Sequence, residues 1–375
     1  MGVRKLFKFL RENNLVKEYQ NLTKYVNTQR RAGGAKPVII CIDFWLYAHK
    51  FTYSYGNMVI GFWNQIIKLM SHKIIPLYVY DGNPPLEKDA VIQHRLKKRT
   101  NLELKLTNIC NEILEDYQSD DIEVGESAAA AVAAVNNEHV REERMEELEK
   151  QKNKLKKSII HIKKVDIDNV KKFFDLLSIP YLSATGEADA LCAKLFKDGY
   201  ITACLSDDMD MLALGCGRTI KFQDGKVLEF DLNYILDQLE LSHSQFVEMC
   251  LLFGCDYIRP TFKIENNESY KLIRLYGTIE NILDKSSHDV FNRDNVRCTA
   301  FIAGYENAKN LLMTSVLNEH IPEDFNPSIL KEIDTFMVLK YLKTYGQGTY
   351  VTENMERILD SIEYVNFHIS KNSFS

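Results

Sequence analysis

The chain has 375 residues, a formal net charge of −5 and a pI near 6.0, and 45% of its residues are hydrophobic. This length and apolar content suffice for one large or two ordinary domains with a sizeable core. The acidic balance argues against a nonspecific nucleic-acid binder, and no apolar run is long enough to span a bilayer. We expect no signal peptide, and the eight cysteines lack paired metal spacing, which suits reduced thiols in a soluble intracellular protein.

Two strands and the helices around them are predicted in the first 80 residues. Val38 to Ile42 and Ile74 to Tyr80 are near-continuous apolar runs, which suit strands buried on both faces of a parallel sheet. With the helical pattern between them they form a βαβ unit with a parallel strand pair. The other expectations here are an amphipathic helix over residues 2–12, irregular structure from 13 to 34, and helices over 44–51 and 57–72.

Residues 86–164 are a long charged insertion between strands of the predicted sheet. Residues 127–135 are alanine-rich and favour helix. Residues 138–157 are charged nearly all round, which is typical of a solvent-exposed or only conditionally ordered helix. We expect the insertion to be a helical cap over the sheet edge, and a disordered insert is the alternative.

Further strands and helices are expected after the insertion. In order, the patterns predict a helix from an Asp166 N-cap to Leu177, a strand over 179–182, a helix from 186 to Gly199, a buried strand over 201–204, a helical turn over 211–215, a β-hairpin over 219–230 with its turn at Asp224-Gly225, and a helix through Phe253 opened by a Ser242-x-x-Gln245 capping box. Residues beyond about 290 are helix-like and carry no chemical signature.

Strands of this predicted sheet end in carboxylates. Asp43 follows the first strand, Asp81 the second, and Leu205-Ser206-Asp207-Asp208-Met209-Asp210 ends a third. Ligands of open α/β sheets lie outside the carboxyl ends of the strands, so these acids are expected to converge there. Because buried unpaired charges are costly, the acids must be solvated, paired or bound to cations. A solvated loop, or helix capping by Glu187 and Asp189, is the alternative to a metal site.

Five ordered motifs resemble the flap endonuclease and XPG-type 5′ nuclease family over residues 1–285. They are Met-Gly-Val-Arg-Lys-Leu at the start, Val-Tyr-Asp-Gly-Asn-Pro-Pro at 79–85, Pro180-Tyr181 with Gly-Glu-Ala-Asp-Ala at 186–190, Ser-Asp-Asp-Met-Asp-Met-Leu at 206–212, and Leu-Phe-Gly-Cys-Asp-Tyr at 252–257. Asp189 stands where the family usually has Glu. Each motif alone is weak, but together, in order and at family-like separations, they are specific.

The resemblance implies an α/β, PIN-like fold with a mostly parallel central sheet flanked by helices, a helical arch and a C-terminal helical region. It implies seven metal-ligating carboxylates: Asp43, Asp81, Glu187, Asp189, Asp208, Asp210 and Asp256. It also implies that Lys88 and Arg95 contact the scissile phosphate as catalytic residues. Ligands that are all oxygen favour two Mg²⁺ ions, about 4 Å apart, for which Mn²⁺ can substitute.

Five residues are candidates for binding DNA. Family members leave Gly2 at the N-terminus near the DNA and commonly carry a base-stacking Tyr where His49 stands here. Arg4, Lys98 and Arg99 belong to basic clusters, and an acidic site flanked by basic surfaces suits an enzyme that acts on a polyanion. We expect a monomer that acts on branched or flapped DNA in the nucleus.

Four regions are predicted along the chain: an N-terminal nuclease region (1–100), the arch (101–165), an internal nuclease region with a degenerate helix-hairpin-helix (166–285) and a C-terminal helical extension (286–375).

The sequence departs from the family pattern in several places. Phe44 and Trp45 are bulky where the family has small residues. Residues 259–269 lack the glycines of the family's duplex-binding hairpin, and we find no sliding-clamp motif of glutamine with paired aromatics.

The predicted function is metal-dependent hydrolysis of DNA phosphodiesters at 5′ flaps or related branches, as an endonuclease and 5′–3′ exonuclease in replication, repair or recombination. One alternative is a noncatalytic nucleic-acid-binding scaffold of the same fold, which predicts lost carboxylates. Another is a phosphatase of a different α/β fold with an aspartate nucleophile, which the basic insertion and the spread of acids disfavour.

Overall fold

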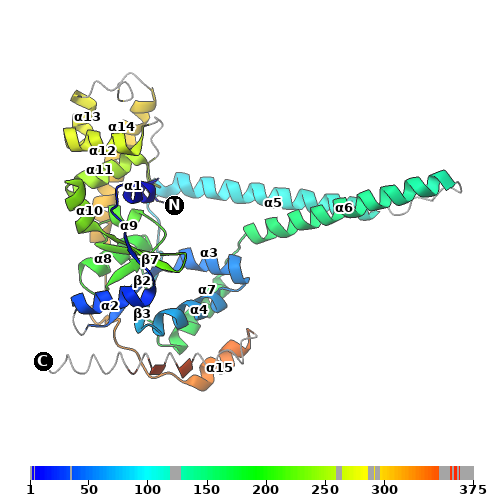
Figure 1. The fold of residues 1–375 in the computed structure, drawn as a ribbon, viewed down its shortest axis with the longest axis horizontal. Helices are drawn as coiled ribbons and strands as arrows, with labels where there is room; N and C mark the ends of the chain where they lie inside the picture. The colour runs from blue at the N-terminus through cyan, green and yellow to red at the C-terminus, as the bar shows by residue number, and fades with distance from the viewer. Residues whose placement is uncertain are drawn as a thin grey trace.

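A central sheet with helices around it and a long helical arm form the protein (Figure 1). The structure is a computed structural model that describes residues 2–3, 5–33, 36–118, 128–258, 264–285, 291, 296–345, 355–356, 359–360 and 363. The strands are β1 (Lys17–Tyr19), β2 (Val38–Asp43), β3 (Ile74–Tyr80), β4 (Tyr181–Ser183), β5 (Ala203–Leu205), β6 (Arg218–Gln223) and β7 (Lys226–Asp231). The α-helices are α1 (Leu6–Glu12), α2 (Leu22–Gly33), α3 (Phe44–Tyr55), α4 (Met58–Met70), α5 (Asp89–Gln118), α6 (Ala128–Ser158), α7 (Lys164–Leu176), α8 (Ala188–Lys197), α9 (Asp210–Ala213), α10 (Leu232–Leu239), α11 (His243–Phe253), α12 (Asn266–Tyr276), α13 (Ile279–Lys285), α14 (Val296–Thr314) and α15 (Thr335–Lys343), with short 3-10 helices η1 (Leu86–Lys88) and η4 (Ser315–Asn318).

The sheet has seven strands in the order β1-β7-β6-β5-β2-β3-β4. Strands β6, β5, β2, β3 and β4 are parallel, while β7 and β1 extend one edge in antiparallel fashion. This confirms the predicted α/β fold with a mostly parallel sheet. Asp43 lies opposite Val79 in the register, and Ile42 lies opposite Leu205. The residues that follow β2, β3 and β5 therefore leave the sheet at the same edge.

Helices cover both faces of the sheet and bury its strands. Tyr78 of β3 stacks on Phe174 of α7 with ring centroids 4.4 Å apart. Cys41 of β2, which alternation points to the other face, lies with its sulfur 3.1 Å from that of Cys192 in α8. Every residue of β3 is buried, as expected for a strand that is packed on both faces.

Two local predictions need correction, and the structure adds one helix. Residues 13–34 contain β1 and α2, because Leu22, Tyr25 and Val26 recur at helical spacing and are buried. Asp166 is the third residue of α7 rather than its N-cap, and its carboxylate accepts the N–H of the N-cap residue Lys163 at 2.8 Å. Helix α10, directly after the hairpin, was not predicted. None of these changes moves a strand that ends in a candidate carboxylate.

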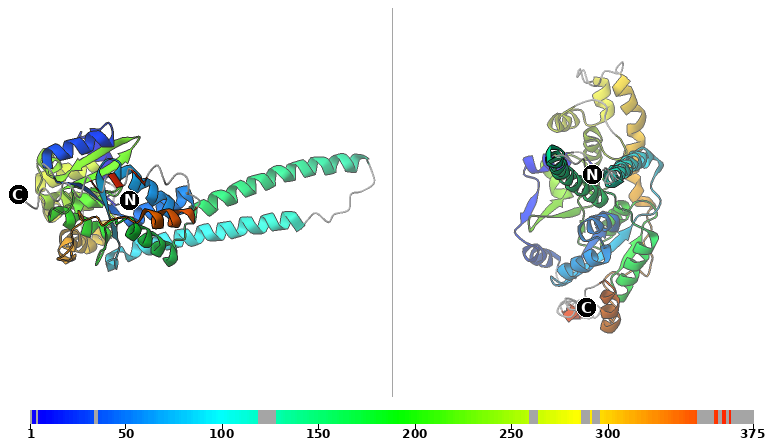
Figure 2. Two further views of the ribbon diagram at one scale, coloured as in Figure 1. Left: turned by 90° about the horizontal axis from the view of Figure 1, so that it is seen from below. Right: turned by 90° about the vertical axis from the view of Figure 1, so that its right-hand side faces the viewer.

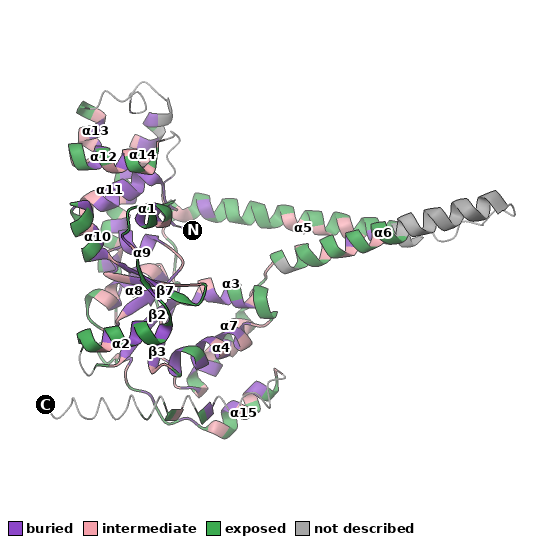
Figure 3. Cartoon of the chain, viewed as in Figure 1, coloured by how far each residue is buried: buried purple, intermediate pink, exposed green. Residues whose placement is uncertain are grey.

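The insertion is a two-helix arm that projects from the body (Figures 1 and 2). Helix α5 has 30 residues, so at 1.5 Å per residue it is about 45 Å long. Leu106, Ile109 and Ile113 of α5 recur at coiled-coil spacing and are shielded, as are Leu148 and Leu155 of α6. This narrow seam explains why a segment so rich in charge is helical, while most of its surface is exposed (Figure 3). The connecting residues 119–127 lie outside the described residues.

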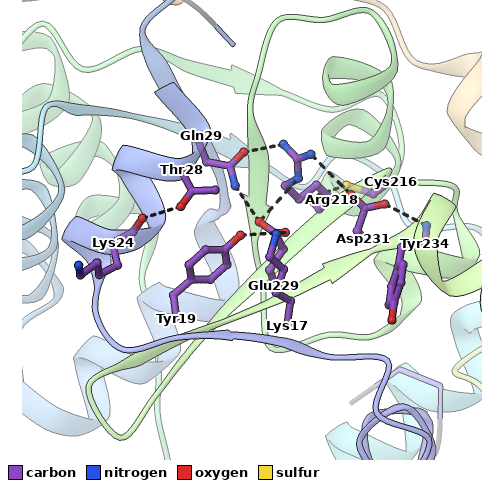
Figure 4. A network of polar contacts seen from close by, with 10 residues as sticks. All are labelled: Lys17, Tyr19, Lys24, Thr28, Gln29, Cys216, Arg218, Glu229, Asp231 and Tyr234. Atoms are coloured by element: carbon purple, nitrogen blue, oxygen red, sulfur yellow. Dashed lines mark hydrogen bonds and ion pairs between the residues drawn. The ribbon is translucent and has the colours of Figure 1, made fainter. Parts of the chain in front are cut away.

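A buried polar network fastens β1 and α2 to the antiparallel edge of the sheet (Figure 4). Glu229 of β7, whose side chain is 3% exposed, accepts hydrogen bonds from Gln29 at 2.8 Å and Tyr19 at 3.3 Å. Arg218 approaches the same carboxylate at 3.8 Å and donates a hydrogen bond from Nη1 to the Gln29 amide oxygen at 2.8 Å. The network holds the N-terminal segment beside the strands that lead to the acidic edge.

Replacing Glu229 with Ala should lower the free energy of unfolding by about 2–3 kcal/mol, because buried donors lose a charged acceptor. Urea denaturation of the variant and the wild type measures this difference. Glu18→Ala is the matched control, since its ion pair with Lys226 is exposed and is worth less than about 1 kcal/mol. Equal losses in the two variants would contradict a stabilising role for the network.

Candidate metal centre

The seven carboxylates that resemblance implies come from five places in the chain. Asp43 ends β2, Asp81 follows β3, Glu187 is the N-cap of α8 with Asp189 in its first turn, Asp208 lies between β5 and α9, Asp210 is the first residue of α9, and Asp256 follows α11. Asp210 is buried, Asp81 is exposed, and the other five are intermediate.

Asp43 and Asp81 are held by backbone groups at the starts of two helices. The Asp43 carboxylate accepts the N–H of Trp45 at 2.8 Å and thereby caps α3. Asp81 accepts the N–H of Ala188 at 2.7 Å. This second bond joins the end of β3 to the start of α8, which carries Glu187 and Asp189. The residues that accept these N–H groups are thus Asp43 and Asp81, whereas Glu187, the N-cap of α8, makes no capping hydrogen bond with its side chain.

Asp208 and Asp210 form a local turn beside the start of the chain. The Asp210 N–H donates to Asp208 Oδ1 at 3.0 Å, and the Asp208 N–H donates to the Ser206 hydroxyl at 3.0 Å. Gly2 has φ +78° and packs so closely that a Cβ there would lie 1.7 Å from Asp208 Oδ1. Only glycine fits this position, so the N-terminal segment directly borders the acidic edge. Arg4 lies outside the described residues.

Two cations from the base of the arm neutralise two of the carboxylates. Lys88 pairs with Glu187, and Arg95 Nη2 lies 2.6 Å from Asp256 Oδ2. The Tyr257 hydroxyl donates to the other oxygen of Glu187. Lys88 and Arg95, the predicted phosphate contacts, therefore lie among the candidate metal ligands.

Burial, and after it mutual repulsion, makes ionisation of this cluster unfavourable. Burial, with the charge of Asp81, raises the pKa of Asp43 to about 8. Burial and the charge of Asp208 hold the pKa of Asp189 and of Asp210 well above the usual range. The acids that contribute to these shifts come from distant parts of the chain: Asp81 acts on Asp43, and Asp208 acts on Asp189 and Asp210.

Lys88 is the group that offsets part of this negative charge. Burial lowers the pKa of Lys88, but the charge and hydrogen bond of Glu187 outweigh it and raise the value to about 12. The Lys88 charge also favours ionisation of Asp189 and Asp210. It therefore stays protonated across the physiological range.

The residues present fit a hard divalent cation. Asp189 Oδ1 and Asp210 Oδ1 are buried and have no hydrogen-bond partner, and a buried polar atom left so is costly. Oxygen-only ligands are those that Mg²⁺ prefers. Over the described ranges, no three acidic, His or Cys side chains are already arranged as a metal cluster. A bound cation would thus draw the side chains inward, with Asp189 and Asp210 as its first candidates.

A groove at the base of the arm adjoins this edge. It has a volume of about 760 Å³ and is lined by His49, Arg95, Lys98, Arg99 and apolar residues of α5. Partial desolvation, together with the charges of Arg95 and Arg99, lowers the pKa of His49. The four residues offer an aromatic ring and three cations on one surface, which is the combination that single-stranded nucleic acid requires.

Sequence reasoning missed two residues of this centre. Tyr257 ends the motif at 252–257, but its hydrogen bond to Glu187 joins residues 70 positions apart, and no local pattern in the sequence indicates it. Glu319, in a region without a chemical signature, contacts the turn before α8. Such contacts follow from packing between distant segments rather than from spacing in the chain.

Comparison with known proteins identifies two family domains and several relatives. The XPG N-terminal domain matches residues 1–102, and the XPG I-region matches residues 178–256. The chain is 31% identical over 235 residues to flap endonuclease 1-A of Sorghum bicolor, covering 61% of this chain and 53% of that protein. It is 31% identical over 237 residues to flap endonuclease 1-B of Physcomitrium patens, covering 62% and 58%. The chain thus spans little more than half the length of these curated relatives.

Solved structures with the same fold include nucleases bound to DNA. The catalytic core of Rad2 in complex with DNA substrate has a TM-score of 0.61 and 17% identity, over 96% of this chain and 99% of that one. Flap endonuclease-1 from Methanococcus jannaschii has a TM-score of 0.56 and 17% identity, over 93% and 98%. Human GEN1 in complex with Holliday junction DNA has a TM-score of 0.60 and 16% identity, over 96% and 78%. At these identities the likeness concerns the fold.

No helix in the described part of the chain is both long and apolar enough to cross a membrane.

The free energy of unfolding of the metal-free protein should fall as pH rises from about 5 to about 8. A carboxyl whose pKa is raised by folding holds its proton more tightly when folded. Its stabilisation is therefore complete below the unfolded pKa, about 4, and is lost through the folded pKa, about 8 for Asp43. Urea denaturation in EDTA across this range gives the profile.

Two controls accompany that profile. Asp43→Asn removes the titrating group and should flatten the slope. Saturating Mg²⁺, which prefers ionised carboxylates, should raise stability more at about pH 8 than at about pH 5. A pH-independent stability, or an equal effect of Mg²⁺ at both values, would contradict a coupled acidic centre.

Proposed function

The chain belongs to the XPG-type 5′ nuclease family, as its two family domains show, and from that membership we propose that it hydrolyses DNA phosphodiesters with divalent metal ions. The proposed reaction is structure-specific cleavage at 5′ flaps or related branched DNA, with endonuclease and 5′–3′ exonuclease modes. Action in the nucleus during replication, repair or recombination is the setting expected from the family.

One observation carries the proposal. Carboxylates from separate elements act on one another's pKa at the edge of the sheet, and two cations of the arm, Lys88 and Arg95, lie among them. Hydrolysis of a phosphodiester needs both kinds of charge, because the carboxylates hold metal ions and the cations meet the anionic substrate. A noncatalytic scaffold would have no need to keep all seven acids.

The chain's own residues would divide the work as follows. Asp208, Asp210 and Asp256 would chiefly hold one ion, and Asp43, Asp81, Glu187 and Asp189 the other or both. When bound, the ions supply an activated water and neutralise charge on the leaving oxygen. Lys88 and Arg95 would exchange their carboxylate partners for oxygens of the scissile phosphate and stabilise the charge that develops there.

The groove beside His49 supports the choice of substrate. Arg95, Lys98 and Arg99 line it, with apolar side chains between them, so it suits a single strand that continues from the cleavage site. Gly2 borders Asp208, which would place the N-terminal segment beside the DNA. Since the curated relatives are longer than this chain, the preferred branch is a matter for experiment.

Cleavage of labelled 5′-flap, nicked, bubble and junction DNAs with Mg²⁺ tests the proposal directly. We expect cleavage near the branch of at least one substrate, products with a 5′-phosphate, and no cleavage in EDTA. Tight binding without any cleavage would instead support the scaffold alternative.

Asp208→Asn should slow single-turnover cleavage by about 100-fold or more and leave DNA affinity unchanged or slightly higher, because it removes ligand charge and no basic surface. Asp207→Asn is the matched control. Asp207 is the adjacent acid, yet it pairs with Lys221 at 3.3 Å and Lys50 at 3.9 Å, outside the cluster. Full activity of Asp208→Asn would refute the metal assignment.

Arg95→Ala should slow single-turnover cleavage by about 10²–10³-fold. Its effect on the dissociation constant should be small, and the salt slope of binding should fall by about one. Lys97→Ala removes an equal charge from an exposed position of the same helix and should leave the cleavage rate unchanged. If the bound Arg95→Ala complex cuts at the wild-type rate, Arg95 only attracts DNA.

A further inference from the structure

Glu319 is a buried carboxylate at the end of η4, far along the chain from the acidic edge. Its side chain is 6% exposed. One oxygen accepts the Thr185 N–H at 2.8 Å, and the other accepts the Gly186 N–H at 2.9 Å. Bonds from N–H groups to a carboxylate are stronger than those between neutral groups. Glu319 therefore grips the turn that directly precedes α8.

The same turn is held from its other side by the segment after Asp81. The Gly82 N–H donates to the Gly186 carbonyl at 2.7 Å, and the Asn83 N–H donates to the Thr185 carbonyl at 3.2 Å. A Cβ on Gly82 would lie 2.3 Å from the Ala184 carbonyl oxygen, so this approach requires glycine. Thr185 and Gly186 thus each have both their N–H and their carbonyl in hydrogen bonds.

The position of this turn sets the position of two candidate metal ligands. Glu187 follows it immediately as the N-cap of α8, and Asp189 lies in the first turn of the helix. The N–H of Ala188, two residues after Gly186, donates to Asp81. A shift of the turn would therefore move Glu187 and Asp189 relative to Asp81, while the sheet itself stayed in place.

We propose that Glu319 is a positioning residue of the metal centre, which fixes the start of α8 so that Glu187 and Asp189 present their carboxylates to the ions. The inference rests on the proposed function, since it assumes the metal role of these two residues. Glu319 lies outside both family domains, which match residues 1–102 and 178–256. The C-terminal region would thereby complete a site whose ligands all lie before residue 257.

Glu319→Gln is the sharpest test, because the amide keeps the size of the side chain but replaces one acceptor oxygen with a donor that faces an N–H. Binding of Mn²⁺ to the DNA-free protein, followed by calorimetry, should weaken by about 10- to 100-fold, as is typical when a partner of a metal ligand is removed. Amide exchange of a peptide that covers residues 184–190 should become faster, while peptides of β2 and β3 keep wild-type rates.

Two further variants serve as a control and as a partial rescue for this measurement. Glu323→Gln makes the same change at an exposed position four residues on and should bind Mn²⁺ like the wild type. Glu319→Asp keeps both oxygens on a shorter side chain and should recover part of the Mn²⁺ affinity. If Glu319→Gln does not fold, Glu319→Asp serves for the same comparison and should bind Mn²⁺ more weakly than the wild type.

Wild-type Mn²⁺ affinity in a folded Glu319→Gln protein with faster exchange at residues 184–190 would overturn the proposal, because Glu319 would then serve stability alone. Failure of the proposed function has a different signature. A wild type that binds Mn²⁺, loses it in Asp208→Asn and still cuts no DNA refutes the nuclease, while the comparison at Glu319 retains its meaning. A wild type that binds no Mn²⁺ refutes both.

Discussion

Repulsion among carboxylates at one edge of the sheet is the constraint on which the rest of the structure depends. Asp43, Asp189 and Asp210 all have a raised pKa because burial and neighbouring acids oppose their ionisation. Such a cluster persists only if surrounding groups supply donors or positive charge. Backbone N–H groups at the starts of α3 and α8 supply some of these donors, since they form hydrogen bonds to Asp43 and Asp81. Two buried oxygens, on Asp189 and Asp210, remain for a cation.

Segments that are remote in sequence are recruited to meet this constraint. The N-terminus contributes Gly2, where the absence of a side chain permits contact with Asp208. The arm contributes Lys88 and Arg95, and the C-terminal region contributes Glu319, which adds negative charge yet holds the backbone that carries two acids. The network around Glu229 of β7 holds β1 and α2 against the antiparallel edge of the sheet. The acidic edge is therefore a product of the whole chain rather than of one motif.

The parts of this architecture with a local signal were predictable from the sequence. Apolar runs that stop at Asp43 and Asp81 became β2 and β3, and Asp224-Gly225 became the turn of a hairpin. In residues 13–34, the three-residue strand β1 is too short to display a period, whereas the helical spacing of Leu22, Tyr25 and Val26 in α2 is a local signal that the prediction of irregular structure overlooked. Tyr257 and Glu319 could not be found in this way, since their partners lie 70 and more than 130 positions away. The roles of the site residues, and the four predicted regions, remain predictions.

The pairing of Lys88 with Glu187 and of Arg95 with Asp256 couples the arm to the acidic edge. In the proposed mechanism, a divalent cation on Glu187 or Asp256 would compete for the same carboxylate oxygens and would release a cationic side chain. A phosphate bound to Lys88 or Arg95 would likewise release a carboxylate. Each event would then make the other more favourable, because linkage between two ligands is reciprocal. Lys88 ends η1 and Arg95 lies in α5, which follows directly at the base of the arm. Substrate and metal would therefore assemble the site together, because either one alone would meet charged groups that are still paired with side chains of the protein.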